Sequence, residues 1–316
     1  YELMDRDDEH YMRDVLALGD RHRLVAAVAI FSHSGIKLVN AGTPVNSAFY
    51  ERLVQHKLLP PLDQSLTVEN CVNSAQLREC AERMLSASSP FARMTRLVNA
   101  DVLLNAFAQI ELPSPLAFKL TVAREQRPSV FDHSVEVALV AVYVQAMEGH
   151  LGRDLTTAAT AGLLHDIGIL HIPSACLQPG KRLSPTDRRY LYSHPITAQL
   201  IVSAYAGIDP IVGSAIKEHH ERMDGSGYPR GLTADRISVL GKVLMLADAG
   251  AALLKSKEGQ QGAIALRLLR RKFCPELLAH LMQLFARVDD GSDRTSTVDP
   301  DVAYRQLNAL TGLLLA

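Results

Sequence analysis

Histidine and aspartate side chains that could bind metal ions recur in the sequence from residue 133 onward. The stretch 217–231 reads KEHHERMDGSGYPRG and places two adjacent histidines directly before a glycine-rich loop. Upstream, a His-Asp pair lies in AGLLHDIGIL and a further histidine in YLYSHPITAQLI. Imidazole and carboxylate groups are common ligands of divalent transition metals. The candidates are His133, His165, Asp166, His194, His219, His220 and Asp248.

Several of these polar groups interrupt stretches that are otherwise apolar. Asp248 falls within KVLMLADAGAAL, and His165 follows the apolar residues of AGLL. Burial of such groups without partners is costly, and a shared metal ion would supply the partners. A single histidine on an apolar helix, however, is usually a core residue whose hydrogen bonds are satisfied by its neighbours. The order and the sequence context of all seven residues therefore have to decide between a metal site and separate core residues.

The overall composition argues against a general binder of nucleic acids. The 316 residues include 33 basic and 34 acidic side chains, which give a formal net charge of -1. Such a chain has no general attraction for a polyanion, and an anionic ligand must be held by a local site. We therefore expect no DNA or RNA partner.

Cysteine use and hydropathy indicate a cytoplasmic protein. The cysteines Cys71, Cys80, Cys176 and Cys274 show no CxxC spacing, and we expect them to be reduced. No stretch approaches about 20 apolar residues free of charge, so no membrane span is expected. The first residues, YELMDRDDEHYMRD, are too charged for a signal peptide.

The first hundred residues predict a small α+β unit. Two β-rich runs, residues 24–31 and 36–40, flank the turn sequence SHSG, which is typical of a hairpin. A helix is expected in NSAFYERLVQHKLLPP, where Asn46 or Ser47 would cap the start and two prolines would end it. Another helix is expected over residues 74–86. We assign residues 1–110 to a regulatory or partner-binding domain through which protein partners could act.

Helical periodicity dominates the rest of the chain, so that residues 111–316 predict a second domain and the protein as a whole is mainly α. The spacing of apolar residues predicts helices over residues 92–110, 114–125, 131–149, 154–166, 185–204, 209–222, 237–256, 261–270 and 275–288. These helices must position the candidate metal ligands.

Taken in order, the candidates resemble the signature of the HD-GYP family, a branch of the HD-domain metal-dependent phosphohydrolases. That signature is a histidine, an HD pair in HDIGK, an HP pair, a segment HHE..DG.GYP..G and an aspartate in an AD element. The match spans residues 129–255, and its motifs are specific. In this chain the pattern appears as His133, His165-Asp166, His194-Pro195, His219-His220-Glu221, Asp224-Gly225, Gly227-Tyr228-Pro229, Gly231 and Asp248.

The resemblance implies a helical HD-type bundle with a binuclear centre that hydrolyses the bacterial second messenger cyclic di-GMP. Two ions about 3.5–4 Å apart would activate a bridging water and neutralise charge on the phosphoryl group. His165 and Asp166 take the catalytic role, and Asp166 bridges the ions. A ligand set without thiolate favours iron, with manganese, zinc and nickel as alternatives. One ion is assigned to His133, His165, Asp166 and Asp248, and the other to His194, His219 and His220.

Some positions depart from the family pattern. Ile169 stands where the family carries the lysine of HDIGK, which removes a cation expected near the scissile phosphate. Ser129 stands where members with three metals place a glutamate, so two ions are expected. After Asp248, the family run FDALTS.RPY is replaced by GAALLKSKE, with Ala251 in the place of an aspartate. Substrate binding is therefore the part of the site in which this chain differs most from the family pattern.

Three functions fit this sequence. The first is a cyclic di-GMP phosphodiesterase of low activity, with Tyr228, Arg230 and Lys257 as candidates for substrate contact. Packing or solvent exposure would explain each of these residues equally well. The second is a degenerate HD-GYP protein that keeps its metals and acts as a nucleotide sensor or a protein-interaction module. The third is a phosphohydrolase for another nucleotide.

Overall fold

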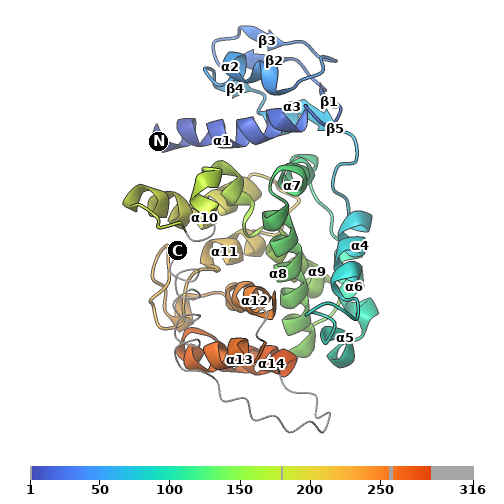
Figure 1. Ribbon diagram of the computed structural model, residues 1–316, viewed down its shortest axis with the longest axis vertical. Coiled ribbons are helices and arrows are strands. Elements are labelled where there is room, and N and C mark those ends of the chain that lie inside the picture. Colours follow the sequence, from blue (N-terminus) through green and yellow to red (C-terminus); the bar gives the residue numbers. More distant parts are fainter. Residues whose placement is uncertain (1, 179–180, 256–258, 286–316) are drawn as a thin grey trace.

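The protein is mainly helical, with two small β-sheets near the N-terminus. The computed structural model describes residues 2–178, 181–255 and 259–285. Figure 1 shows the strands and α1 at one end of the molecule, a helical body below them, and α13 and α14 at the opposite end. The predicted fold class, a helical bundle with a small N-terminal α+β region, is confirmed. Lys257 lies outside the described residues.

The N-terminal region contains short antiparallel strands and a long first helix. β2 pairs with both β3 and β4, while β1 pairs with β5. The hairpin around SHSG is confirmed. The prediction of a single strand over residues 24–31 is wrong. The run is divided into β1 and β2, because the Ala27 N–H donates to the Ser65 carbonyl and the chain passes from one sheet to the other there. The elements are α1 (Glu2–Leu18), β1 (Leu24–Ala26), β2 (Ile30–Ser32), β3 (Lys37–Val39), α2 (Tyr50–Leu53), β4 (Leu58–Leu59), α3 (Leu62–Ser65) and β5 (Leu66–Val68).

The helical body follows the predicted pattern with two differences. The helix expected over residues 92–110 is divided, because the Asn99 side chain accepts from the Asp101 N–H at 2.8 Å and starts a new helix. The helix expected over 209–222 ends at Glu218. The helices are α4 (Ser74–Met84), α5 (Met94–Leu97), α6 (Ala100–Ala108), α7 (Ser114–Gln126), α8 (Pro128–Met147), α9 (Arg153–Leu164), α10 (Pro185–Ser203), α11 (Pro210–Glu218), α12 (Val239–Lys255), α13 (Gly259–Leu268) and α14 (Pro275–Phe285).

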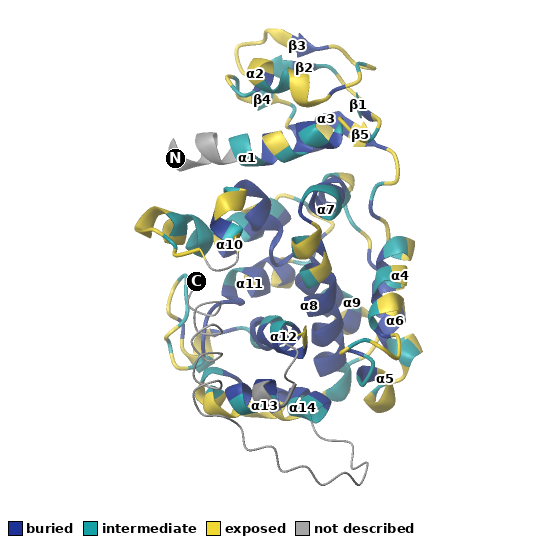
Figure 2. Cartoon of the chain, viewed as in Figure 1, coloured by how far each residue is buried: buried dark blue, intermediate teal, exposed yellow. Residues whose placement is uncertain are grey.

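Helix α8 forms the centre of the helical body. It packs against α7, α9 and α12, and in Figure 2 it is dark blue along most of its length. Among the described helices it alone is long and apolar enough to cross a membrane, but 72% of its most apolar window is buried inside the protein. An apolar helix covered on all sides is a core helix. The helices α4 and α6 contact α8 as well, and the domain boundary at residues 110/111 stays a prediction.

Arg127 connects the N-terminal region to the short 3-10 helix η2 (Ile167–His171), which follows the HD pair. Its Nε donates to Asp14 Oδ2 of α1 at 2.7 Å. Its Nη1 donates to the carbonyl oxygens of Ile169 and Ile172 at 2.7 and 3.0 Å. Because the Arg127 residue is only 8% exposed, these partners replace water for its guanidinium group.

Arg127→Ala is expected to lower the free energy of unfolding by about 3 kcal/mol, because it leaves the half-buried Asp14 carboxylate and two carbonyls without their donor. Urea unfolding followed by circular dichroism measures this loss. Arg83→Ala is the control, since it removes exposed contacts with Glu79 and Cys80 on α4 and should cost less than about 1 kcal/mol. Equal effects of the two substitutions would contradict the role of Arg127.

Candidate metal centre

The structure brings all seven predicted metal ligands together in the core. His133 lies on α8, His194 on α10 and Asp248 on α12, while the HD pair follows α9 and the two adjacent histidines follow α11. Their donor atoms form two groups, and within each group the atoms lie within 4.8 Å of one another. One group contains His133, His165 and Asp248; the other contains Asp166, His194, His219 and His220.

Three of the imidazoles are held in one tautomer by backbone carbonyls of the helices that they lie on or directly follow. The Nδ1 atoms of His165, His194 and His219 each face the carbonyl oxygen three residues earlier in the chain, at Gly162, Leu191 and Ile216. A carbonyl oxygen only accepts, so Nδ1 carries the hydrogen. Nε2 of each neutral ring then presents a lone pair. The backbone therefore points three lone pairs toward the same small region.

These lone pairs face acceptors rather than donors. His194 Nε2 lies 3.2 Å from His219 Nε2. His165 Nε2 lies 3.2 Å from Asp166 Oδ2, yet this nitrogen, Asp166 Oδ1 and His220 Nδ1 are buried without a hydrogen-bond partner. Buried acceptors that converge in this way repel one another unless a cation lies between them. The donor set thus fits divalent metal ions.

Asp166 lies between the two groups. Its Oδ2 faces His165 of the first group at 3.2 Å, while its Oδ1 faces His194 at 3.2 Å and His219 at 3.7 Å in the second. The carboxylate therefore turns one oxygen toward each group of candidate ligands.

The protonation states of the metal-free centre differ between the groups. Burial, together with the neighbouring His165 and His194, lowers the pKa of His219 to about 3. Burial also opposes the charge on His133, but hydrogen bonds to Asp248 and Glu136 outweigh it and raise its pKa to about 10. His133 Nε2 accordingly lies 3.0 Å from Asp248 Oδ1. A cation that binds the first group must take the place of this proton.

Gly168 allows η2 to lie directly on α10. A Cβ atom at this position would lie 2.3 Å from the His194 carbonyl oxygen and 2.8 Å from the Ala198 nitrogen. No side chain fits there without moving one of the two segments. The close approach places Asp166, two residues before Gly168, within reach of His194 on the neighbouring helix.

The loop after the two adjacent histidines is anchored by buried glutamates. Glu221 is fully buried, and its two carboxylate oxygens accept from the backbone N–H groups of Arg230 and Leu232, each at 2.8 Å. Glu218 accepts from the N–H and hydroxyl of Ser238 at 2.9 and 2.6 Å. This second anchor could not be predicted from the sequence, because Glu218 and Ser238 lie 20 residues apart.

The predicted substrate residues lie in different surroundings. The Tyr228 ring stacks on His220 with 4.7 Å between centroids, and so it borders the centre. The Arg230 guanidinium pairs with Glu218 at 3.1 Å. The Ile169 side chain is 7% exposed and packs beside Val130 and Leu191 in a small apolar cluster. Tyr192, which was not among the residues predicted from the sequence, stacks on Tyr228 with 4.4 Å between the ring centroids.

The fold and the site define a helical protein with a buried centre for divalent metal ions. The family described as HD domain matches residues 110–271, just over half of the chain. The chain therefore belongs to the HD domain family.

Sequence relatives agree with this assignment. The chain is 31% identical to a cyclic di-GMP phosphodiesterase of Pseudomonas aeruginosa over 114 residues, which are 36% of this chain and 28% of that protein. It is 32% identical to the 3'3'-cGAMP-specific phosphodiesterase 1 of Vibrio cholerae, over 40% of this chain and 29% of that protein. It is 28% identical to the cyclic di-GMP phosphodiesterase response regulator RpfG of Xanthomonas campestris pv. campestris, over 68% and 55% of the two chains.

The predicted assignment to the HD-domain proteins is confirmed by the family match. The chain nevertheless spans less than a third of the length of the Pseudomonas and Vibrio relatives. Among solved structures, an HDG"Y"P protein of Bdellovibrio bacteriovorus is similar over 82% of this chain and 94% of its own, with a TM-score of 0.47 and 16% sequence identity.

Substitutions of two ligands should affect metal content differently. Asp166→Ala is expected to reduce the metal bound at both groups, because both of its oxygens face ligands, whereas His194→Ala should empty mainly the second group. Elemental analysis of the purified variants measures the loss per chain. His33→Ala, in the exposed turn between β2 and β3, is the matched control. Full metal content in Asp166→Ala would exclude the bridging position.

Proposed function

We propose that this protein is a phosphodiesterase that hydrolyses a cyclic dinucleotide, with cyclic di-GMP as the first candidate, at a centre of two metal ions. The observation that carries the proposal is the arrangement of Asp166, whose two oxygens face separate groups of buried imidazoles. Two adjoining sites that share a carboxylate are the arrangement used for phosphodiester hydrolysis in two-metal enzymes.

The substrate class is supported by the relatives. Two of the three relatives described above are named for cyclic di-GMP and one for 3'3'-cGAMP. Both compounds are cyclic dinucleotides joined by two phosphodiester bonds. Cyclic di-GMP is therefore the first substrate to test, and 3'3'-cGAMP represents the alternative of another nucleotide.

The residues of the chain would divide the work as follows. His133, His165, Asp166 and Asp248 would hold one ion, and His194, His219 and His220 the other. Bound ions would activate water and neutralise charge on the phosphoryl group. The HD pair takes the catalytic role, because Asp166 holds both groups at a fixed spacing and the Gly162 carbonyl keeps the His165 ring oriented. Glu218 and Glu221 keep the loop that carries Tyr228 in place.

The ligand chemistry supports a proposal for the identity of the ions. A set of imidazoles and carboxylates without a thiolate favours iron, with manganese, zinc and nickel as alternatives. Two ions are preferred over three, since Ser129 offers no carboxylate beside the first group. We place the protein in the cytoplasm and assign a regulatory or partner-binding role to residues 1–110.

A second candidate is a degenerate member that binds metals and nucleotide without efficient turnover. The observation that favours it is Ile169, whose apolar side chain packs beside Leu191 at the position where the family carries lysine. Arg230, a candidate for substrate contact, is already paired with Glu218. Both features reduce the positive charge available to a phosphate.

Metal content and turnover test the proposal together. The purified protein should carry about two transition-metal ions per chain, because seven ligands suffice for two sites that share a carboxylate. Elemental analysis gives the stoichiometry. Turnover of cyclic di-GMP, 3'3'-cGAMP and simple phosphoesters gives the substrate class. Absence of metal after expression in metal-rich medium would remove the basis for any metal-dependent activity.

Ile169→Lys is expected to raise the turnover of cyclic di-GMP by about 100-fold, the typical effect of one preorganised charge contact. The long lysine stem could cover the apolar cluster while its ammonium group reaches the site. Ile169→Met is the matched control, because it keeps the volume without the charge. A folded Ile169→Lys variant with two metals and no gain would show that the missing cation is not limiting.

A further inference from the structure

We infer that the start of α10 forms a second subsite for the cyclic dinucleotide, in which Tyr192 stacks on a base and Arg188 and Arg189 hold the phosphate that is not being hydrolysed. This inference rests on the proposed function and names the residues that would select a dinucleotide. None of these residues belongs to the motifs on which the family resemblance is based.

A stack of aromatic rings leads from the metal centre to this surface. The His220 ring lies 4.7 Å from Tyr228 with 28° between the planes, and Tyr228 lies 4.4 Å from Tyr192 with 20° between the planes. His220 belongs to the second group of candidate ligands. Tyr192 is therefore two ring contacts from a metal ligand, and it also lines a hollow on the outside of the protein.

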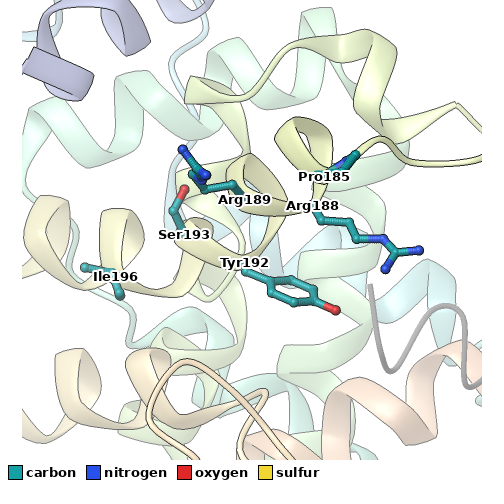
Figure 3. Close-up of a pocket in the computed structure, with 6 residues that line it drawn as sticks. All are labelled: Pro185, Arg188, Arg189, Tyr192, Ser193 and Ile196. Atoms are coloured by element: carbon teal, nitrogen blue, oxygen red, sulfur yellow. The ribbon is translucent and has the colours of Figure 1, made fainter.

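The hollow is open to solvent and is lined by residues of α10 alone. Its volume is about 520 Å³. Figure 3 shows the Tyr192 ring near the Arg188 side chain, while the Arg189 side chain points away from them, on the side of Ser193. Aromatic rings stack on bases of any type, and apolar neighbours such as Ile196 suit the flat face of a base.

The two arginines supply positive charge at the surface of α10. Both Arg188 and Arg189 are exposed, and no ion pair joins either one to another residue of the described chain. A smaller adjoining hollow is lined by Arg188 together with Arg182. Guanidinium groups bind phosphate through paired hydrogen bonds.

The chemistry of a cyclic dinucleotide matches this arrangement. The molecule carries two phosphates and two bases, and only one phosphate can lie at the metal centre during a given hydrolysis. The second phosphate and a base then need a cationic and aromatic surface close to that centre. With Ile169 apolar and Arg230 paired to Glu218, Arg188 and Arg189 provide charge that these positions do not.

The test compares a dinucleotide with a small diester on the metal-loaded full chain. Binding and KM are measured for cyclic di-GMP and 3'3'-cGAMP, and KM for bis(4-nitrophenyl) phosphate, which can reach the centre without filling the hollow. Tyr192→Ala should raise the ratio of the dinucleotide KM to the small-diester KM by about tenfold, the usual value of one stacked base. Tyr192→Phe keeps the ring and should restore most of the affinity.

The arginines are tested by salt dependence. The double substitution Arg188→Gln with Arg189→Gln should weaken dinucleotide binding by roughly tenfold at low salt and by less at high salt, because screening reduces the contribution of exposed charges. Arg83→Gln on α4, which is also exposed, is the matched control. Because the arginines lie at the surface, this variant tests the inference even if Tyr192→Ala fails to fold.

The outcomes separate this inference from the proposed function. Wild-type turnover of a dinucleotide with unchanged ratios in all variants would overturn the subsite and leave the phosphodiesterase standing. Wild-type binding without turnover, weakened by the same substitutions, would support the subsite and count against the enzyme. An equal rise of KM for both substrates would show that Tyr192 acts through Tyr228 on the centre, and would overturn the subsite. Failure of the wild-type protein to bind either dinucleotide would also overturn it.

Discussion

The orientation of imidazoles by backbone carbonyls is the constraint on which the rest of the site depends. His165, His194 and His219 each face the carbonyl oxygen three residues earlier, in the preceding helical turn. This contact satisfies a backbone acceptor and aims the ring lone pair inward at the same time. Each helix must therefore bring its histidine to the centre. The packing of α8 against α9 and α12 fixes the positions of these helices relative to one another. The positions of the candidate metal ligands therefore depend on the packing of the apolar core.

The loop that closes the site depends on a second set of buried polar contacts. Glu221 accepts from two backbone N–H groups of the loop, and Glu218 accepts from Ser238 and from Arg230. These bonds replace the regular hydrogen bonds that a glycine-rich segment cannot make within itself. They hold Tyr228 against His220. The loop thus connects the metal centre to the surface of α10, where the Tyr228 ring stacks on Tyr192.

Sequence reasoning predicted the local features and missed the contacts between distant residues. Periodic apolar spacing located α7 to α14, although α11 ends earlier than expected, and ordered motifs identified the seven residues that the structure gathers. The first helix was missed because its charged start obscured the buried positions Tyr11, Val15 and Leu18. Its packing partners lie far along the chain, as do those of Tyr192 and Arg127. Such pairs have no local signal, since only the three-dimensional fold makes them neighbours.

The position of Arg127 gives the N-terminal region a thermodynamic connection to the centre. The same guanidinium group bonds to Asp14 of α1 and to the carbonyls of Ile169 and Ile172, close behind the HD pair. Displacement of α1 would therefore change the stability of η2. Because Asp166 directly precedes η2, it would also change the affinity for metal ions. Linkage of this kind is reciprocal. Occupation of the metal centre would therefore change the free energy with which α1 docks by the same amount as the docking of α1 changes the free energy of metal binding.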